Sequence, residues 1–143
     1  MKTLIACSLL LLAQGALAQS KPEPILPGSL KWAGAAGAAQ NVMVVGAADK
    51  AGLYQQRVRM PPGSKIQPHT HPDERISVVL EGTIYVGFGE KFDESNVVAI
   101  PTGAVYVAPA GTPHYVWAKD GAAIYQEGGM GPTATKFTQQ PGQ

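Results

Sequence analysis

The 143-residue chain is poor in the residues that most often carry reactive chemistry. It has one cysteine, three histidines and no surplus of either charge, with eleven basic against ten acidic residues. The single cysteine is Cys7, near the amino terminus, so the main part of the chain has neither a disulfide nor a catalytic thiol. A near-neutral chain without a basic cluster is not suited to binding nucleic acid or an anionic membrane surface.

Long apolar runs are also absent beyond the first residues. The chain begins with Lys2, an apolar run from Leu4 to Leu12 and the triplet Ala16-Leu17-Ala18. A positive end, an apolar core and an A-x-A site are typical of a secretory signal peptide, and the run is shorter than the roughly 20 apolar residues of a spanning helix. We therefore expect cleavage after Ala18 and a periplasmic or secreted mature protein, with no membrane attachment after cleavage.

Helical periodicity is the third feature that the sequence lacks. Beyond residue 18, short β-rich runs alternate with turn signals such as Asp120-Gly121. The run Leu53–Met60 alternates, with Tyr54, Val58 and Met60 on one side. The pattern predicts an all-β barrel or jelly-roll sandwich. We expect a signal peptide at 1–18, a flexible leader with a first edge segment at 19–40, a barrel at 41–130 and a tail at 131–143.

All three histidines fall in two segments that combine strand and turn signals. His69 and His71 are two residues apart, and side chains two apart in a strand point to the same face. His114 lies in a second segment of the same kind, which begins at Gly103. Three imidazoles and one carboxylate would form a mixed ligand set for a divalent transition metal, Fe, Mn, Ni, Cu or Zn. Ligand type does not identify the metal.

At these two segments the sequence resembles the cupin family. The positions that match the first family motif are Gly63, His69, His71 and Gly82, and those that match the second are Gly103, Pro109, Gly111 and His114. Ala118 stands where the second motif ends in asparagine. The resemblance covers residues 53 to 130. It implies a single cupin β-barrel, a double-stranded β-helix of the jelly-roll type, with His69, His71 and His114 as metal ligands.

The carboxylate ligand of the first motif is out of register in this chain. The family position is held by Arg75, and Glu74 comes one residue early. A bulge after Pro72 would turn Glu74 inward, together with Ile76, Val78 and Leu80 as an apolar stripe. The family register would instead bury Arg75 beside a dication, at a cost on the order of several kcal/mol without a paired anion. We therefore favour Glu74 as the fourth ligand over Arg75 facing the site, with Asp73 as a weaker candidate.

The resemblance leaves two classes of function open. Metal-dependent cupins include dioxygenases, isomerases, lyases and decarboxylases, which implies a metalloenzyme acting on a small oxygenated organic molecule. The alternative is a non-catalytic module that binds a metal or a small ligand, including a metal-free pocket in which the imidazoles form hydrogen bonds. A general acid or base beside the ligands would favour the enzyme. Exposed edge strands also predict a homodimer.

Overall fold

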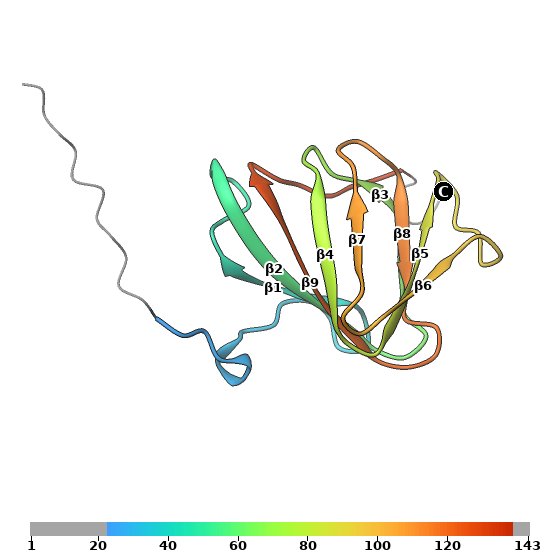
Figure 1. The fold of residues 1–143 in the computed structure, drawn as a ribbon, viewed down its shortest axis with the longest axis horizontal. Helices are drawn as coiled ribbons and strands as arrows, with labels where there is room; N and C mark the ends of the chain where they lie inside the picture. The colour runs from blue at the N-terminus through green and yellow to red at the C-terminus, as the bar shows by residue number, and fades with distance from the viewer. Residues whose placement is uncertain (1–22, 139–143) are drawn as a thin grey trace, which may run out of the picture.

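Short antiparallel strands form the framework of the computed structural model, which describes residues 23–138 (Figure 1). The first sheet has the strand order β1-β2-β9-β4-β7 and contains β1 Gln40–Val45, β2 Gly52–Met60, β9 Ala123–Gly131, β4 Arg75–Glu81 and β7 Val105–Ala108. The second has the order β10-β3-β8-β5-β6 and contains β10 Lys136–Phe137, β3 Lys65–Thr70, β8 His114–Trp117, β5 Thr83–Phe88 and β6 Val98–Pro101. A 3₁₀ helix, η1, spans Pro27–Ser29.

The chain passes repeatedly from one sheet to the other, and the inner faces of both sheets enclose the core. Strand β2 shows the alternation that the sequence predicts, because Tyr54, Val58 and Met60 are buried. The core residues come from both sheets: Val58, Met60, Val79, Ile84, Val86, Tyr106, Ala108, Val116, Ala118, Ala123 and Tyr125. The expected all-β barrel of the jelly-roll type is confirmed.

Strand β4 has the register that we disfavoured from the sequence. Arg75 and Ser77 are buried, whereas Ile76 is 58% exposed and Leu80 is 37% exposed. The expected inward stripe of Ile76, Val78 and Leu80 is therefore wrong. The family register holds, and Arg75 points into the barrel.

The two ends of the chain differ in what the structure describes. The predicted signal peptide, with its cleavage point after Ala18, lies outside the described residues. The tail contributes strand β10, which pairs with β3 at Thr70 and His69. Between residues 23 and 138, we find no helix with the length and apolar character needed to cross a membrane.

Two motif glycines provide a test of backbone strain. Gly82 and Gly103 both have a positive φ, +71° and +85°, a conformation that costs other residues about 1–3 kcal/mol. A Cβ on Gly82 would also collide with the carbonyl oxygen of Ala122, whereas a Cβ on Gly103 would meet nothing within 4 Å. We expect Gly82→Ala to lower the free energy of unfolding more than Gly103→Ala in urea denaturation. Equal losses would contradict the close approach at Gly82.

Candidate metal centre

The three histidines converge on one point inside the barrel. His69 and His114 are paired residues of the neighbouring strands β3 and β8, and His71 directly follows β3. Their ring centroids are 4.3 to 5.2 Å apart, and the candidate ligand atoms all lie within 4.8 Å of one another. All three side chains are buried. Two strand positions and one turn thus form the cluster that the motif spacing indicated.

A backbone carbonyl fixes the orientation of each imidazole. The Nδ1 atoms of His69, His71 and His114 lie 2.7, 2.8 and 3.1 Å from the carbonyl oxygens of Gln67, Ala134 and Thr112. Because a carbonyl can only accept a hydrogen bond, each Nδ1 carries the proton. The lone pair of each ring is therefore on Nε2. Metal-binding histidines are held in this way when Nε2 is the ligand atom.

Burial keeps the three rings neutral. It lowers the pKa of His69 to about 4, with the neighbouring His114 as the next cause, and it lowers the pKa of His71 to about 4 against the effect of the Ala134 hydrogen bond. The pKa of His114 is also lowered, mainly by burial. Neutral imidazole is the form that binds a metal.

The donor set fits a divalent transition metal. The Nε2 atom of His71 is buried and has no hydrogen-bond partner, and a buried polar atom of this kind requires a ligand or a water molecule. Three nitrogens bound to one ion at about 2.0–2.1 Å in tetrahedral geometry lie about 3.4 Å apart. The candidate ligand atoms lie within 4.8 Å of one another, so the three rings would move closer together on binding the ion. Among the described residues, the group contains three histidines and no carboxylate.

The expected fourth ligand, Glu74, lies outside this group. Glu74 is exposed, and Arg75 takes the inward position. The predicted bulge that would turn Glu74 inward is therefore absent, and that prediction is wrong. The physical reason is that Arg75 has a buried anionic partner. Its Nη1 donates to Oε1 of Glu127 over 2.6 Å, and both side chains are at most 6% exposed. The burial penalty that we assigned to an unpaired guanidinium therefore does not apply.

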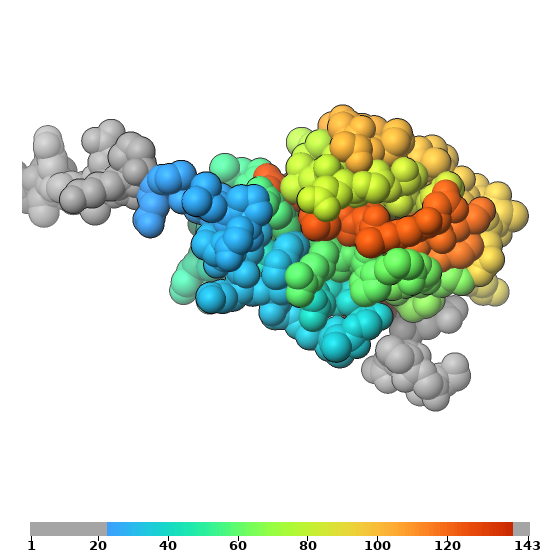
Figure 2. Space-filling view, turned by 90° about the horizontal axis from the view of Figure 1, so that it is seen from below, coloured from blue at the N-terminus to red at the C-terminus, as the bar shows by residue number. Residues whose placement is uncertain are grey.

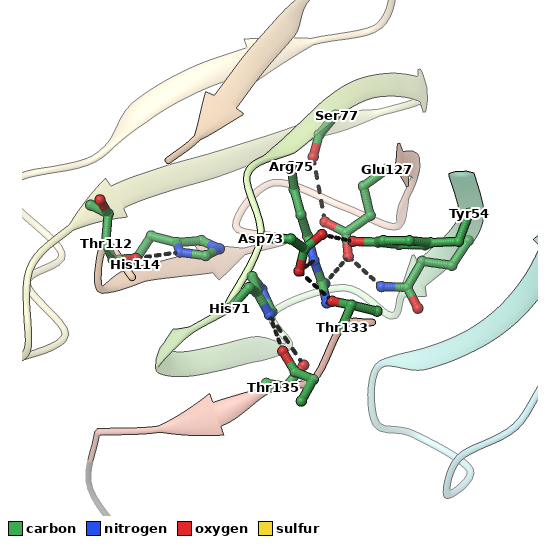
Figure 3. A network of polar contacts seen from close by, with 12 residues as sticks. Tyr54, His71, Asp73, Arg75, Ser77, Thr112, His114, Glu127, Thr133 and Thr135 are labelled. Atoms are coloured by element: carbon green, nitrogen blue, oxygen red, sulfur yellow. Dashed lines mark hydrogen bonds and ion pairs between the residues drawn. The ribbon is translucent and has the colours of Figure 1, made fainter. Parts of the chain in front are cut away.

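The Arg75–Glu127 pair is the centre of a polar network beside the histidines (Figure 3). Glu127 also accepts hydrogen bonds from Gln56 and, over 3.4 Å, from Ser77. Arg75 Nη2 donates to the hydroxyl of Thr133 over 2.8 Å. The Nε atom of Arg75 lies 4.0 Å from Asp73, and the hydroxyl of Tyr54 donates to Asp73 over 2.6 Å. Asp73, our third candidate ligand, thus belongs to this network and not to the cluster.

Glu127 and the tail belong to the site although the sequence analysis did not predict them there. Glu127 was detectable, because Ala123, Tyr125 and Glu127 alternate along one run, and a carboxylate on a buried face requires a cation. Such a cation was available at the family's glutamate position, Arg75. Ala134 and Thr133 carried no such signal, because the tail acts through a backbone carbonyl and a hydroxyl.

The comparisons with known proteins agree with this geometry. A family profile described as "Cupin domain" matches residues 56–125. Germin-like protein 5-1 of Oryza sativa subsp. japonica is 33% identical over 96 residues, which are 64% of this chain and 38% of that protein. Germin-like protein subfamily T member 2 of Arabidopsis thaliana is 31% identical over 78 residues, 54% of this chain and 36% of that protein. The chain thus spans less than half the length of these relatives.

Solved structures give the same fold. The polyketide cyclase RemF from Streptomyces resistomycificus has a TM-score of 0.70 at 13% identity, covering 85% of this chain and 89% of RemF. An oxalate oxidase has a TM-score of 0.52 at 25% identity, covering 60% of this chain and 46% of the oxidase. The architecture and the buried histidine cluster therefore define a small β-barrel of the cupin type. The chain belongs to the cupin family.

The buried ion pair gives a stability prediction. Removing one partner of such a pair leaves an unpaired buried charge, at a cost of about 3–5 kcal/mol. We expect Arg75→Met to lower the free energy of unfolding by about that amount, and the double variant Arg75→Met/Glu127→Leu to recover most of it. The matched control is Lys50→Met, which breaks the exposed Lys50–Asp49 pair and should have little effect. A double variant no more stable than Arg75→Met would contradict the pairing.

The lowered histidine pKa values also predict a dependence of stability on pH. A group whose pKa is lower in the folded state than in the unfolded state takes up fewer protons when folded, so stability rises with pH between the two pKa values. For protein stripped of metal, the contribution of the neutral His69 and His71 to the free energy of unfolding is present above pH 6.5 and is lost as the pH falls towards about 4. Urea denaturation at several pH values should show a shallower dependence for His69→Asn. An unchanged slope would contradict the burial of a neutral His69.

Proposed function

We propose that this cupin binds a divalent transition metal through His69, His71 and His114, and that the bound metal serves an enzyme acting on a small oxygenated organic molecule. The observation that carries the proposal is the convergence of three buried imidazoles, each with its Nδ1 proton donated to a carbonyl. Three protein ligands leave coordination positions open for water or substrate, which distinguishes a catalytic site from a closed structural one. Such a metal would act as a Lewis acid.

The side chains beside the cluster support an enzyme more than a passive binding module. Burial is the main cause of the lowered pKa values of His69 and His71; the Glu127 carboxylate opposes the lowering at His69, and the Arg75 guanidinium adds to the lowering at His71. Both charges therefore lie within electrostatic reach of the ligands. A carboxylate in this position can accept a proton from a substrate, and a guanidinium can bind a developing negative charge. The alternative of a non-catalytic metal-binding or ligand-binding module remains the second candidate, because one fold serves many functions.

The comparisons support a substrate class without naming a substrate. One similar structure, at 26% identity and a TM-score of 0.51, is an oxalate oxidase in complex with the substrate analogue glycolate. Both compounds are small acids with several oxygen atoms. Oxygen donors of this kind fit open positions on a hard or borderline metal ion. We therefore propose small carboxylic and hydroxycarboxylic acids as the first compounds to test on this chain.

The cellular setting of this proposal rests on the sequence. The signal-peptide pattern of residues 1–18 supports a periplasmic or secreted protein. Its partners would be a small molecule and a second copy of the chain.

Metal stoichiometry provides the direct test of the site. Purified protein reloaded in turn with Fe, Mn, Ni, Cu and Zn should hold about one ion per chain for at least one of these metals. His114→Ala should lose that metal, because one of three ligands is gone. The matched control Glu74→Ala, at an exposed position, should keep it. Elemental analysis that finds no metal in the wild type, or an effect of Glu74→Ala equal to that of His114→Ala, would contradict the proposed ligand set.

A second experiment separates the enzyme from the binding module. The metal-loaded protein is incubated with a panel of small carboxylic and hydroxycarboxylic acids, and products are followed by NMR. Glu127→Gln leaves Arg75 without its anion, so the variant is first shown to be folded by circular dichroism. If Glu127 transfers a proton, the folded variant should retain the metal and lower turnover by roughly 10²- to 10⁴-fold. Asp73→Asn, which removes the network carboxylate that accepts from the hydroxyl of Tyr54, should change turnover much less. Metal-dependent binding of an acid without turnover would favour the binding module.

A further inference from the structure

Two phenylalanine side chains continue the row of imidazoles across the second sheet. Phe137 of β10 is the paired residue of His69, and Phe88 of β5 is the paired residue of His114. Because directly paired residues of antiparallel strands point to the same face, both phenyl rings lie on the face that carries the histidines. The ring centroids of Phe137 and His69 are 5.8 Å apart, and those of Phe88 and His114 are 6.3 Å apart. A phenylalanine thus flanks the imidazole pair on each side.

This face is the inside of the barrel, yet both phenyl rings are exposed. Along β5, Ile84 and Val86 point the same way as Phe88, because residues two apart share one face, and they are at most 2% exposed. In contrast, Phe88 is 46% exposed and Phe137 is 44% exposed. An inward side chain that solvent reaches borders an opening of the barrel. The two phenyl rings therefore mark a mouth beside the buried histidines.

The other end of the barrel, where β2 and β8 finish, is closed. Met60, Ala118 and Ala123 lie at this end and are at most 2% exposed. The backbone N–H of Gly63 donates to the carbonyl of Ala118 over 2.7 Å. In the view from below, the chain between β8 and β9, in orange-red, crosses the middle of this end (Figure 2). A small molecule would therefore reach the histidines from the mouth, past the two phenyl rings.

We propose that Phe88 and Phe137 determine which substrate the metal centre accepts, by packing against an apolar group of an acid whose oxygen atoms bind the metal. This proposal rests on the proposed metal site and narrows its substrate class. Oxalate carries no apolar group and glycolate carries a single methylene, so both acids would leave the phenyl rings exposed to water. An acid with an aromatic substituent would cover them.

The chemistry and the width of the mouth both favour such an acid. A phenyl ring offers no hydrogen bond to the oxygens of a compact acid, whereas covering its exposed part with an apolar group removes apolar surface from water. Aromatic rings also gain from contact with one another at centroid distances of about 4.5–7 Å. Strands β10 and β5 are three strand spacings apart, about 14 Å, which leaves room for a phenyl group between the two rings. Ligand sites commonly combine apolar walls of this kind with a few polar groups that fix orientation.

The third phenylalanine of the chain provides an internal control. Phe92 packs against Tyr115 and Trp117, with ring centroids 4.6 and 6.2 Å apart. These two residues alternate with the inward-facing His114 and Val116 along β8, so they point to the outer face of the sheet. Phe92 therefore lies on the opposite side of the sheet from the mouth.

Calorimetric titration with two acids that differ by one phenyl group tests the proposal. Glycolate and mandelate share the 2-hydroxycarboxylate group, and mandelate adds the phenyl ring. In oxygen-free buffer, the metal-loaded wild type should bind mandelate about tenfold more tightly than glycolate, because the phenyl group is buried in the mouth. The double variant Phe88→Ala/Phe137→Ala should lose this preference. The matched control Phe92→Ala should keep it.

The possible results separate this proposal from the metal site on which it rests. Equal affinities of the wild type for the two acids, no affinity for either, or equal losses in Phe92→Ala and the double variant would overturn the role of the phenyl rings and leave the metal site standing. Thermal unfolding and elemental analysis should show that the double variant folds and holds as much metal as the wild type. Loss of the metal from that variant would mean that the rings support the histidines instead, which also overturns the proposal. A wild type that holds no metal would overturn the proposed function together with this inference.

Discussion

The ion pair between Arg75 and Glu127 determines how this barrel differs from the pattern of its family. A buried guanidinium is tolerated only when an anion compensates it, and the β4–β9 register provides that anion. Glu127 is the residue opposite Ser77, which places its carboxylate diagonally from Arg75, within reach of a long side chain. Strand β4 can therefore direct Arg75 inward, and Glu74 consequently faces solvent.

The same pair shapes the chemistry of the histidine cluster. With Arg75 at the position of a carboxylate ligand, the cluster consists of three neutral donors, and a dication held there would keep its full charge. The nearby Glu127 carboxylate would offset part of that charge without coordinating the ion. The tail participates as well, since the Ala134 carbonyl orients His71 and Thr133 links Arg75 to Asp73. Residues beyond β9 thus form part of the site.

The sequence predicted the fold and the histidine cluster because both depend on local spacing. Alternation in Leu53–Met60 is enough to orient Tyr54, and the two-residue interval between His69 and His71 brings both rings to one face. The direction of β4 was not predictable from its own residues. It depends on Glu127, 52 residues further along the chain, and on the pairing of β4 with β9. A one-residue change of register reverses every side chain of a strand, so this single long-range contact changed the expected fourth ligand.

The most direct measurement is a crystal structure of metal-loaded protein with anomalous diffraction recorded at the absorption edge of the metal. The expected result is one peak bonded to Nε2 of His69, His71 and His114 at about 2.0–2.2 Å, with Arg75 still paired to Glu127 and Glu74 in solvent. A peak coordinated by Glu74, or by a Glu127 released from Arg75, would contradict the three-histidine site. A histidine cluster that remains without a peak in the presence of each candidate metal would contradict metal binding itself.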